Sequence, residues 1–184
     1  MATGYSSTSI SKTSGFTANI RFKYTTTYDI ATNTSTVALL PQVKTTANFG
    51  SDVRFFGPST STAGVYGNGT KRYSVGNNYG GNDTLRTSAT TQNSWASLSP
   101  HSGSISTFSI THNEEGVASF TCGMIGTLVE MYSNSTATFN SKNGITVSIT
   151  ETAPYSITYD ANNGTGAPPP QNIYATCTYT ISTI

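Results

Sequence analysis

Charged residues are scarce in this sequence. Only 9% of the 184 residues are Asp, Glu, Lys or Arg, against roughly 25% in an average soluble domain. Nine basic and eight acidic side chains leave a net charge of +1, and only Lys71 and Arg72 are adjacent cations. Nucleic acids and anionic membranes are bound through clustered basic side chains. The charge pattern therefore argues against a nucleic-acid partner.

Long apolar runs are also missing. No stretch approaches the roughly eighteen apolar residues of a membrane-spanning helix, and Met1 to Gly4 does not begin a secretory signal peptide. We therefore expect no membrane insertion. For a chain that starts at Met1, we expect synthesis in a cytoplasm without signal-peptide-directed secretion.

Cysteine is also scarce: the sequence contains two, Cys122 and Cys177. Their separation has no metal-binding spacing. Cys122 falls on the same strand face as Ala118 and Phe120, so a buried free thiol is expected there, with a disulfide as the alternative. We expect no metal and no cofactor.

Helix-forming residues are few, and strand-forming residues take their place. Eleven Tyr and eight Phe join abundant Thr and Val, which suit a pleated, half-buried surface, while Gly and Asn suit its turns. No stretch has a helical apolar period. The composition predicts an all-β protein.

Alternation of apolar and polar residues marks the strands. In one strand Ile20, Phe22 and Tyr24 share a face, a turn at 29–35 follows, and Pro41 is expected to end the next strand. Further strands are expected near 104–111, 117–126, 134–139 and 144–151. Turn signals between closely spaced strands predict an antiparallel β-sandwich over residues 1–154.

The interior and the loops of this sandwich follow from the same pattern. Residues 57–94 are rich in Gly, Asn, Ser and Thr and are interpreted as long loops over a sandwich face, with short strands near 71–75 and 84–89. The expected core consists of Ile20, Phe22, Val37, Leu39, Phe108, Ile110, Phe120, Val147 and Ile149.

A hairpin within residues 109–122 holds the most suggestive polar group. His112, Glu114 and Glu115 could form an acid–base pair or part of a metal site. However, a zinc site needs three protein ligands, and no third ligand is near. A turn at Asn113 to Gly116 is expected to leave all three side chains solvated, so replacing any of them with Ala should change stability by no more than about 0.5 kcal/mol. We therefore expect no catalytic residue here and no enzyme.

Four aromatic residues in the Gly/Asn-rich middle are the best binding candidates. Flat rings among amide side chains suit the recognition of a host surface glycan. Against this, Trp95 is expected to fill the core, and the tyrosines could equally lie at an interface. The candidates are Tyr66, Tyr73, Tyr79 and Trp95.

Several segments, taken in order, resemble a known domain. They are "TYDIATNTSTV" (27–37), a central Trp95, "FSITHNEEGVASFTCGMIGT" (108–127) and "ATFNSKNGITVSITETAP" (137–154). Together they resemble a domain of tailed-phage (siphophage-type) tail and virion structural proteins, over residues 2–154. Glu115 stands where that family usually has Asp, and the family's closing "PRAS" is absent. The resemblance implies a structural protein of tail tips or fibre-like assemblies.

A second resemblance begins at residue 155. "YSITYDANNGTGAPPPQNIYATCTYTIS" (155–182) resembles the opening of the Listeria–Bacteroides (internalin B-type) repeat, with Asn163 in place of the first Gly of its pair. That repeat is an all-β surface-display unit about twice as long, so the match is partial. We expect a β-hairpin arm at 155–184, with strands at Tyr155–Tyr159 and Tyr174–Ile181. A lone hairpin is marginal in water, so this arm should dock on another chain. Its expected docking side chains are Tyr155, Ile157, Tyr159, Cys177, Tyr179 and Ile181.

These observations favour a non-enzymatic protein on the outside of a tailed-phage virion, assembled in the bacterial cytoplasm. A tail-associated, adhesion-type appendage is expected first, and a capsid decoration or head-fibre protein is the alternative. A carbohydrate-binding module of a bacterial surface protein is the further alternative. The expected partners are other virion proteins and further copies in a homo-oligomer, for which a trimer is one form.

Overall fold

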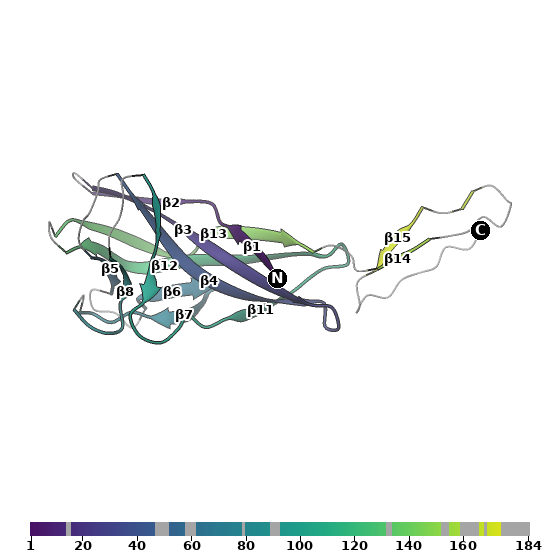
Figure 1. Cartoon of the computed structure of the whole chain (residues 1–184), viewed down its shortest axis with the longest axis horizontal. Helices are drawn as coiled ribbons and strands as arrows, with labels where there is room; N and C mark the ends of the chain where they lie inside the picture. Colours follow the sequence, from purple (N-terminus) through teal and green to yellow (C-terminus); the bar gives the residue numbers. More distant parts are fainter. Residues whose placement is uncertain are drawn as a thin grey trace.

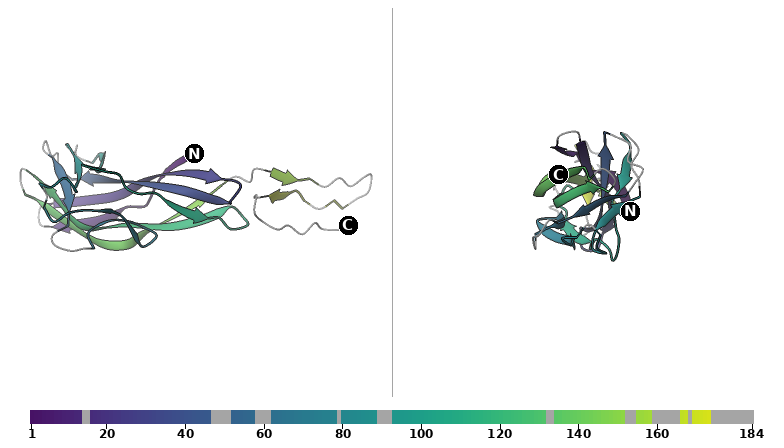
Figure 2. Two further views of the ribbon diagram at one scale, coloured as in Figure 1. Left: turned by 90° about the horizontal axis from the view of Figure 1, so that it is seen from below. Right: turned by 90° about the vertical axis from the view of Figure 1, so that its left-hand side faces the viewer.

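The computed structural model describes residues 1–13, 16–46, 52–57, 62–78, 80–88, 93–131, 134–151, 155–158, 166–167 and 169–173. All regular structure in these ranges is β-strand. Two antiparallel sheets pack together as a sandwich, with strands running along one long axis (Figure 1 and Figure 2). The prediction of an all-β antiparallel sandwich is confirmed.

Two long strands form the centre of the first sheet. β3 and β4 pair along twelve residue positions. On the side of β3 away from β4, β3 pairs with β1 and β2. On the side of β4 away from β3, β4 pairs with β9 and β11. The strands are β1 (Ala2–Tyr5), β2 (Ser9–Thr13), β3 (Phe16–Asp29), β4 (Thr34–Thr45), β9 (Trp95–Ser97) and β11 (Phe108–Thr111).

The second sheet is organised around the hairpin of β12 and β13. β12 pairs with β13 along one edge and with β5 and β6 in succession along the other. β7 extends the sheet beyond β6, and β8 and β10 extend it beyond β5. The strands are β5 (Val53–Phe56), β6 (Gly64–Gly67), β7 (Thr70–Ser74), β8 (Leu85–Thr87), β10 (Ser99–Pro100), β12 (Val117–Glu130) and β13 (Thr136–Thr150).

A short hairpin lies outside these two sheets. β14 (Tyr155–Ile157) pairs with β15 (Gln171–Ile173) in a two-stranded sheet of its own. Figure 1 shows this pair beyond one end of the sandwich. The expected strand at Tyr174–Ile181 lies outside the described residues, as do Tyr159, Cys177, Tyr179 and Ile181. For Tyr155 and Ile157 the structure describes the backbone.

The interior confirms the core predicted from alternation. The expected side chains are buried, except Ile149, which is half-buried against the core. Aromatic rings join the two sheets edge to face, because Phe120 of β12 lies 5.6 Å from both Tyr24 and Phe108 of the first sheet. Each such ring pair contributes about 0.5–1.5 kcal/mol beyond its buried area. Cys122 lies in this core as a free thiol, as expected.

Pro41 does not end its strand, contrary to the prediction. β4 continues to Thr45, and Pro41 lies opposite Phe22. The Pro41 carbonyl accepts a hydrogen bond from the Leu98 amide at 2.8 Å, on the side away from β3. The amide and carbonyl of a strand residue point to the same side. The amide hydrogen that proline lacks would therefore face away from β3, and the β3–β4 ladder loses no donor.

The region 57–94, which was expected to be mostly loop, contains more strand than predicted. β7 and β8 match the expected short strands, but β6 was not predicted, and Val65 of β6 and Leu85 of β8 are core residues. β6 is hard to recognise in the sequence because it begins and ends with glycine, which is depleted in strands. The strands expected at 134–139 and 144–151 form one strand, β13, opposite an irregularity in β12 between Cys122 and Met124.

Candidate functional site

His112 is buried, which corrects the prediction that it is solvated. It follows β11, and its side chain is only 4% exposed. Its Nδ1 lies 2.8 Å from the Gly116 carbonyl oxygen and its Nε2 lies 2.9 Å from Ser35 Oγ. Because a carbonyl oxygen only accepts, Nδ1 carries the hydrogen of the first bond, and Nε2 and the Ser35 hydroxyl form the second.

The same residues join two turns at one end of the sandwich. The His112 amide donates to the Asn33 carbonyl at 3.0 Å, and Asn33 Nδ2 donates back to the His112 carbonyl at 3.1 Å. Tyr28 packs its ring edge-on against His112 at 5.2 Å and donates its hydroxyl hydrogen to Asn33 Oδ1 at 2.8 Å. We call Tyr28, Asn33, Ser35, His112 and Gly116 the turn clamp.

Backbone geometry explains the residue types in the clamp. Asn33 has φ 50° and Gly116 has φ 72°, and these left-handed values favour Asn and Gly. The Gly116 amide donates to the Asn113 carbonyl at 3.0 Å, so the turn expected at 113–116 is present. Glu114 and Glu115 lie exposed on it, as expected.

Ser35 and His112 in the clamp resemble the serine–histidine pair of a hydrolase, but the Ser35 hydroxyl is not accessible to a substrate. Ser35 is fully buried, and its hydroxyl also lies 3.4 Å from Glu151 Oε1. The partner of His112 Nδ1 is a backbone carbonyl rather than a carboxylate. A substrate cannot reach this hydroxyl in the described conformation. The geometry therefore suits a structural role, which is to hold the β3–β4 and β11–β12 turns together.

The four aromatic candidates are not brought together. Tyr66 is buried on β6, and its hydroxyl donates to the Thr62 carbonyl, so its ring offers no open face. Tyr73 is half-buried on β7 and donates to the Ser102 carbonyl at 3.0 Å. Burial raises the pKa of both phenols; for Tyr73 the Asp83 charge adds to the rise and the Ser102 side chain partly offsets it. Trp95 lies on β9 in the other sheet.

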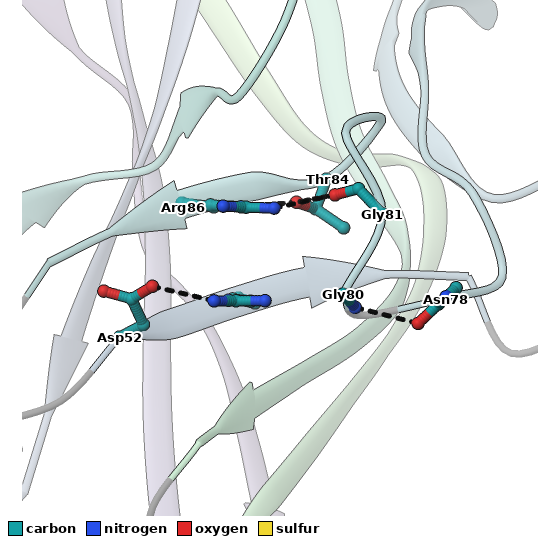
Figure 3. Close-up of polar contacts among 7 residues, drawn as sticks. Asp52, Asn78, Gly80, Gly81, Thr84 and Arg86 are labelled. Carbon is teal, nitrogen blue, oxygen red and sulfur yellow. Dashed lines mark hydrogen bonds and ion pairs between the residues drawn. The ribbon is translucent and has the colours of Figure 1, made fainter.

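Tyr79 lies outside the described residues, but the described residues of the polar loop on either side of it make several hydrogen bonds. Figure 3 shows Arg86 reaching this loop, where it donates from Nη2 to the Gly81 carbonyl at 2.8 Å and from Nε to Thr84 Oγ1 at 2.9 Å. Asn78 Oδ1 accepts from the Gly80 amide at 2.9 Å. The loop therefore uses its own polar groups to fold.

Trp95 belongs to a surface group that the sequence did not reveal. Arg21 on β3 places its guanidinium 4.3 Å from the Trp95 ring centre and 4.1 Å from that of Tyr5 on β1. Gln42 on β4 fixes the guanidinium, because its Oε1 accepts from Arg21 Nε at 2.8 Å. Lys44 Nζ lies 5.1 Å from the Trp95 ring centre. We call Tyr5, Arg21, Gln42, Lys44 and Trp95 the Arg21 row.

The Arg21 row lies on the outer face of the first sheet. Along β3 the neighbours Ile20 and Phe22 point into the core, so Arg21 points outward. Trp95 lies opposite Lys44 in the β4–β9 register and shares that face. The expectation that Trp95 fills the core is therefore wrong, because the ring covers polar strand positions outside the core.

Comparisons with known proteins give no assignment: no protein-family model matches the chain, and no match is found among curated proteins or solved structures. Within the described residues, no group of three His, Cys, Asp or Glu side chains could hold a metal ion. No helix in the same residues is long and apolar enough to span a membrane.

Proposed function

We propose that the chain is a non-enzymatic structural protein displayed on the outside of a tailed-phage virion, as a tail-associated, adhesion-type appendage. One observation carries the proposal. Two of the four features that carry the phage resemblance, the segments 27–37 and 108–127, supply the two halves of the turn clamp. Their shared residue types therefore have a common physical basis in one piece of tertiary structure.

The electrostatics and the buried polar groups are in keeping with this role. The net charge is +1. His112, the residue considered as a catalytic candidate, is buried and hydrogen-bonded within the turn clamp. A virion surface protein needs a stable scaffold and an exposed face rather than a reactive centre. The sandwich provides the scaffold, and the β14–β15 segment extends beyond it (Figure 1).

Imaging of purified phage particles that carry this sequence tests the proposal. A gold-labelled antibody against the chain should mark the tail in electron micrographs. Label on the capsid would favour the decoration or head-fibre alternative. If particles carry no label while the host-cell surface does, the virion proposal is wrong and a bacterial surface module takes its place.

A further inference from the structure

The outer face of the first sheet carries an unneutralised group of cations. Arg21 and Lys23 project from β3, and Lys44 projects from β4. In the part of the chain that the structure describes, Arg21, Lys23 and Lys44 belong to no ion pair within 4 Å, whereas Arg54 pairs with Asp52 in and beside the second sheet. No described carboxylate therefore neutralises these three cations.

The Arg21 guanidinium is preorganised for an anion. Rings approach it from strands on both sides, since Tyr5 comes from β1 and Trp95 from β9 beyond β4. Its Nε is bound to Gln42, while its two Nη atoms have no hydrogen-bond partner among the described residues. A fixed planar fork with free donors matches the geometry of a carboxylate or sulfate.

A shallow hollow continues this surface along the strands. It has a volume of about 180 Å³ and is lined by Lys23, Thr25, Ala38, Leu39 and Leu40. The hollow is smaller than the roughly 300–1,000 Å³ of pockets that enclose drug-sized ligands. It suits one ring of a chain that lies on the surface. Its apolar floor complements the non-polar face of a sugar, and Lys23 brings a positive charge to its edge.

We propose that this face, from the Arg21 row to the Lys23 hollow, binds an anionic polysaccharide. The Arg21 guanidinium binds an acidic group, the Trp95 ring packs against a sugar ring, and Lys23 and Lys44 attract neighbouring acidic groups. Arg21 and Lys23 are two residues apart on one strand, which spaces their backbones by about 7 Å. The inference gives a ligand class to the adhesion role proposed above and depends on that proposal for its biological setting.

The chemistry favours a polysaccharide over a nucleic acid. Aromatic rings with nearby cations could also stack unpaired bases. However, nucleic-acid affinity depends on neutralising many phosphates, and this face has three cations in a chain of net charge +1. Ser97, half-buried on the same face, offers a neutral hydroxyl: its Oγ accepts from Gln42 Nε2 at 3.4 Å, which leaves its hydroxyl hydrogen to donate. Such groups suit sugar hydroxyls.

Tryptophan fluorescence of the full chain provides the test, because Trp95 is the single tryptophan. Purified protein is titrated at low salt with oligogalacturonate, sialyl oligosaccharides and sulfated oligosaccharides, each against an uncharged counterpart. At least one acidic series should change the Trp95 emission saturably, and added salt should weaken the binding. Absence of binding to all three series, or equal binding of the uncharged sugars, would overturn the proposal.

Substitutions locate the binding. Arg21→Gln should weaken the affinity about tenfold or more, because a charged hydrogen-bonding partner is lost. Arg21→Lys should recover only part of it, because the planar fork is lost. Tyr5→Ala, at an exposed position, should weaken binding without unfolding. Lys142→Gln is the matched control, because it removes an exposed cation near Tyr66 on the other sheet, and it should change the affinity less than about twofold.

Other outcomes have defined meanings. Binding that Arg21→Gln and Tyr5→Ala leave unchanged would place the ligand elsewhere and overturn the site. Arg21-dependent binding of a single-stranded oligonucleotide or of anionic vesicles, without binding of any acidic sugar, would overturn the ligand class. These measurements use purified protein, so a failure here leaves the imaging test of virion placement independent.

Discussion

His112 makes three side-chain interactions inside the turn clamp: two hydrogen bonds and one edge-on contact with Tyr28. Replacing His112 with Ala removes all three and leaves buried polar partners at Ser35 and Gly116. We expect the free energy of unfolding to fall by about 2–4 kcal/mol. Urea unfolding measures the change.

Glu114→Ala is the control for this substitution. Glu114 is exposed two residues away on the same turn, and its replacement should change stability by no more than about 0.5 kcal/mol. If His112→Ala is equally mild, the clamp does not stabilise the fold.

Cys122 provides a second test at the scale of one residue. Burial raises the pKa of its thiol from 9.0 to about 12. Above pH 9 the unfolded chain loses this proton while the folded chain keeps it, so the unfolded state binds fewer protons and stability falls as pH rises. The loss is about 1.4 kcal/mol for each pH unit between the two pKa values.

A comparison with Cys122→Ala isolates this contribution. Between pH 8 and pH 10, the native chain should lose more stability than the variant, as measured by urea unfolding. A thiol reagent at pH 8 should react with Cys122 only in the unfolded chain, and the variant identifies the signal of Cys177. Equal pH dependence of the two chains, or rapid labelling of folded Cys122, would contradict the assignment.

At the scale of single elements, the β12–β13 hairpin depends on a close backbone approach at Gly123. A Cβ atom there would lie 2.1 Å from the Ser141 carbonyl oxygen and 2.8 Å from the Lys142 carbonyl carbon. Both are backbone atoms, which cannot rotate away as a side chain can. Gly123→Ala should therefore reduce the free energy of unfolding by at least about 2 kcal/mol.

Ser119→Ala on the same strand is the matched control. Ser119 is exposed on β12, so the change should be within about 0.5 kcal/mol. Thermal and urea unfolding compare the two variants. A Gly123→Ala protein as stable as the Ser119→Ala protein would show that the two strands can separate here at little cost.

Alternation in the sequence predicted the long strands and their buried faces, because a period of two places every second side chain in the core. The same rule carries a signal for His112 that the sequence interpretation missed. Phe108 and Ile110 point inward, so His112, two residues further along, points inward too. Expecting a solvated turn from Asn113 and Gly116 ignored this continuation.

The Arg21 row could not be predicted in the same way. Tyr5, Arg21 and Trp95 come from β1, β3 and β9, and they meet only through strand pairing between distant segments. β1 and β9 are four and three residues long, too short for alternation to reveal them. Their register follows from tertiary packing rather than from local sequence.

At the scale of the whole molecule, the described strands after the sandwich, β14 and β15, pair in a two-stranded sheet of their own. Unpaired edges invite pairing with another chain, and a lone hairpin is marginal in water. Deleting residues 155–184 should leave the sandwich folded, with unchanged near-ultraviolet circular dichroism. The truncated chain should form fewer homo-oligomers, as measured by light scattering, and enter fewer particles. A truncated chain that assembles and incorporates like the full chain would exclude an assembly role for this arm.

The path of β13 has a mechanical consequence. β13 runs along the long axis and ends at Thr150, beside the turn clamp, after pairing with β12 at twelve positions from Val117 to Val129. A pull at residue 151 along the strand axis slides β13 past β12 and loads these ladder hydrogen bonds in shear, so many must break together. A pull across the strand would break them one at a time. The sandwich should therefore resist force along its length better than force across it.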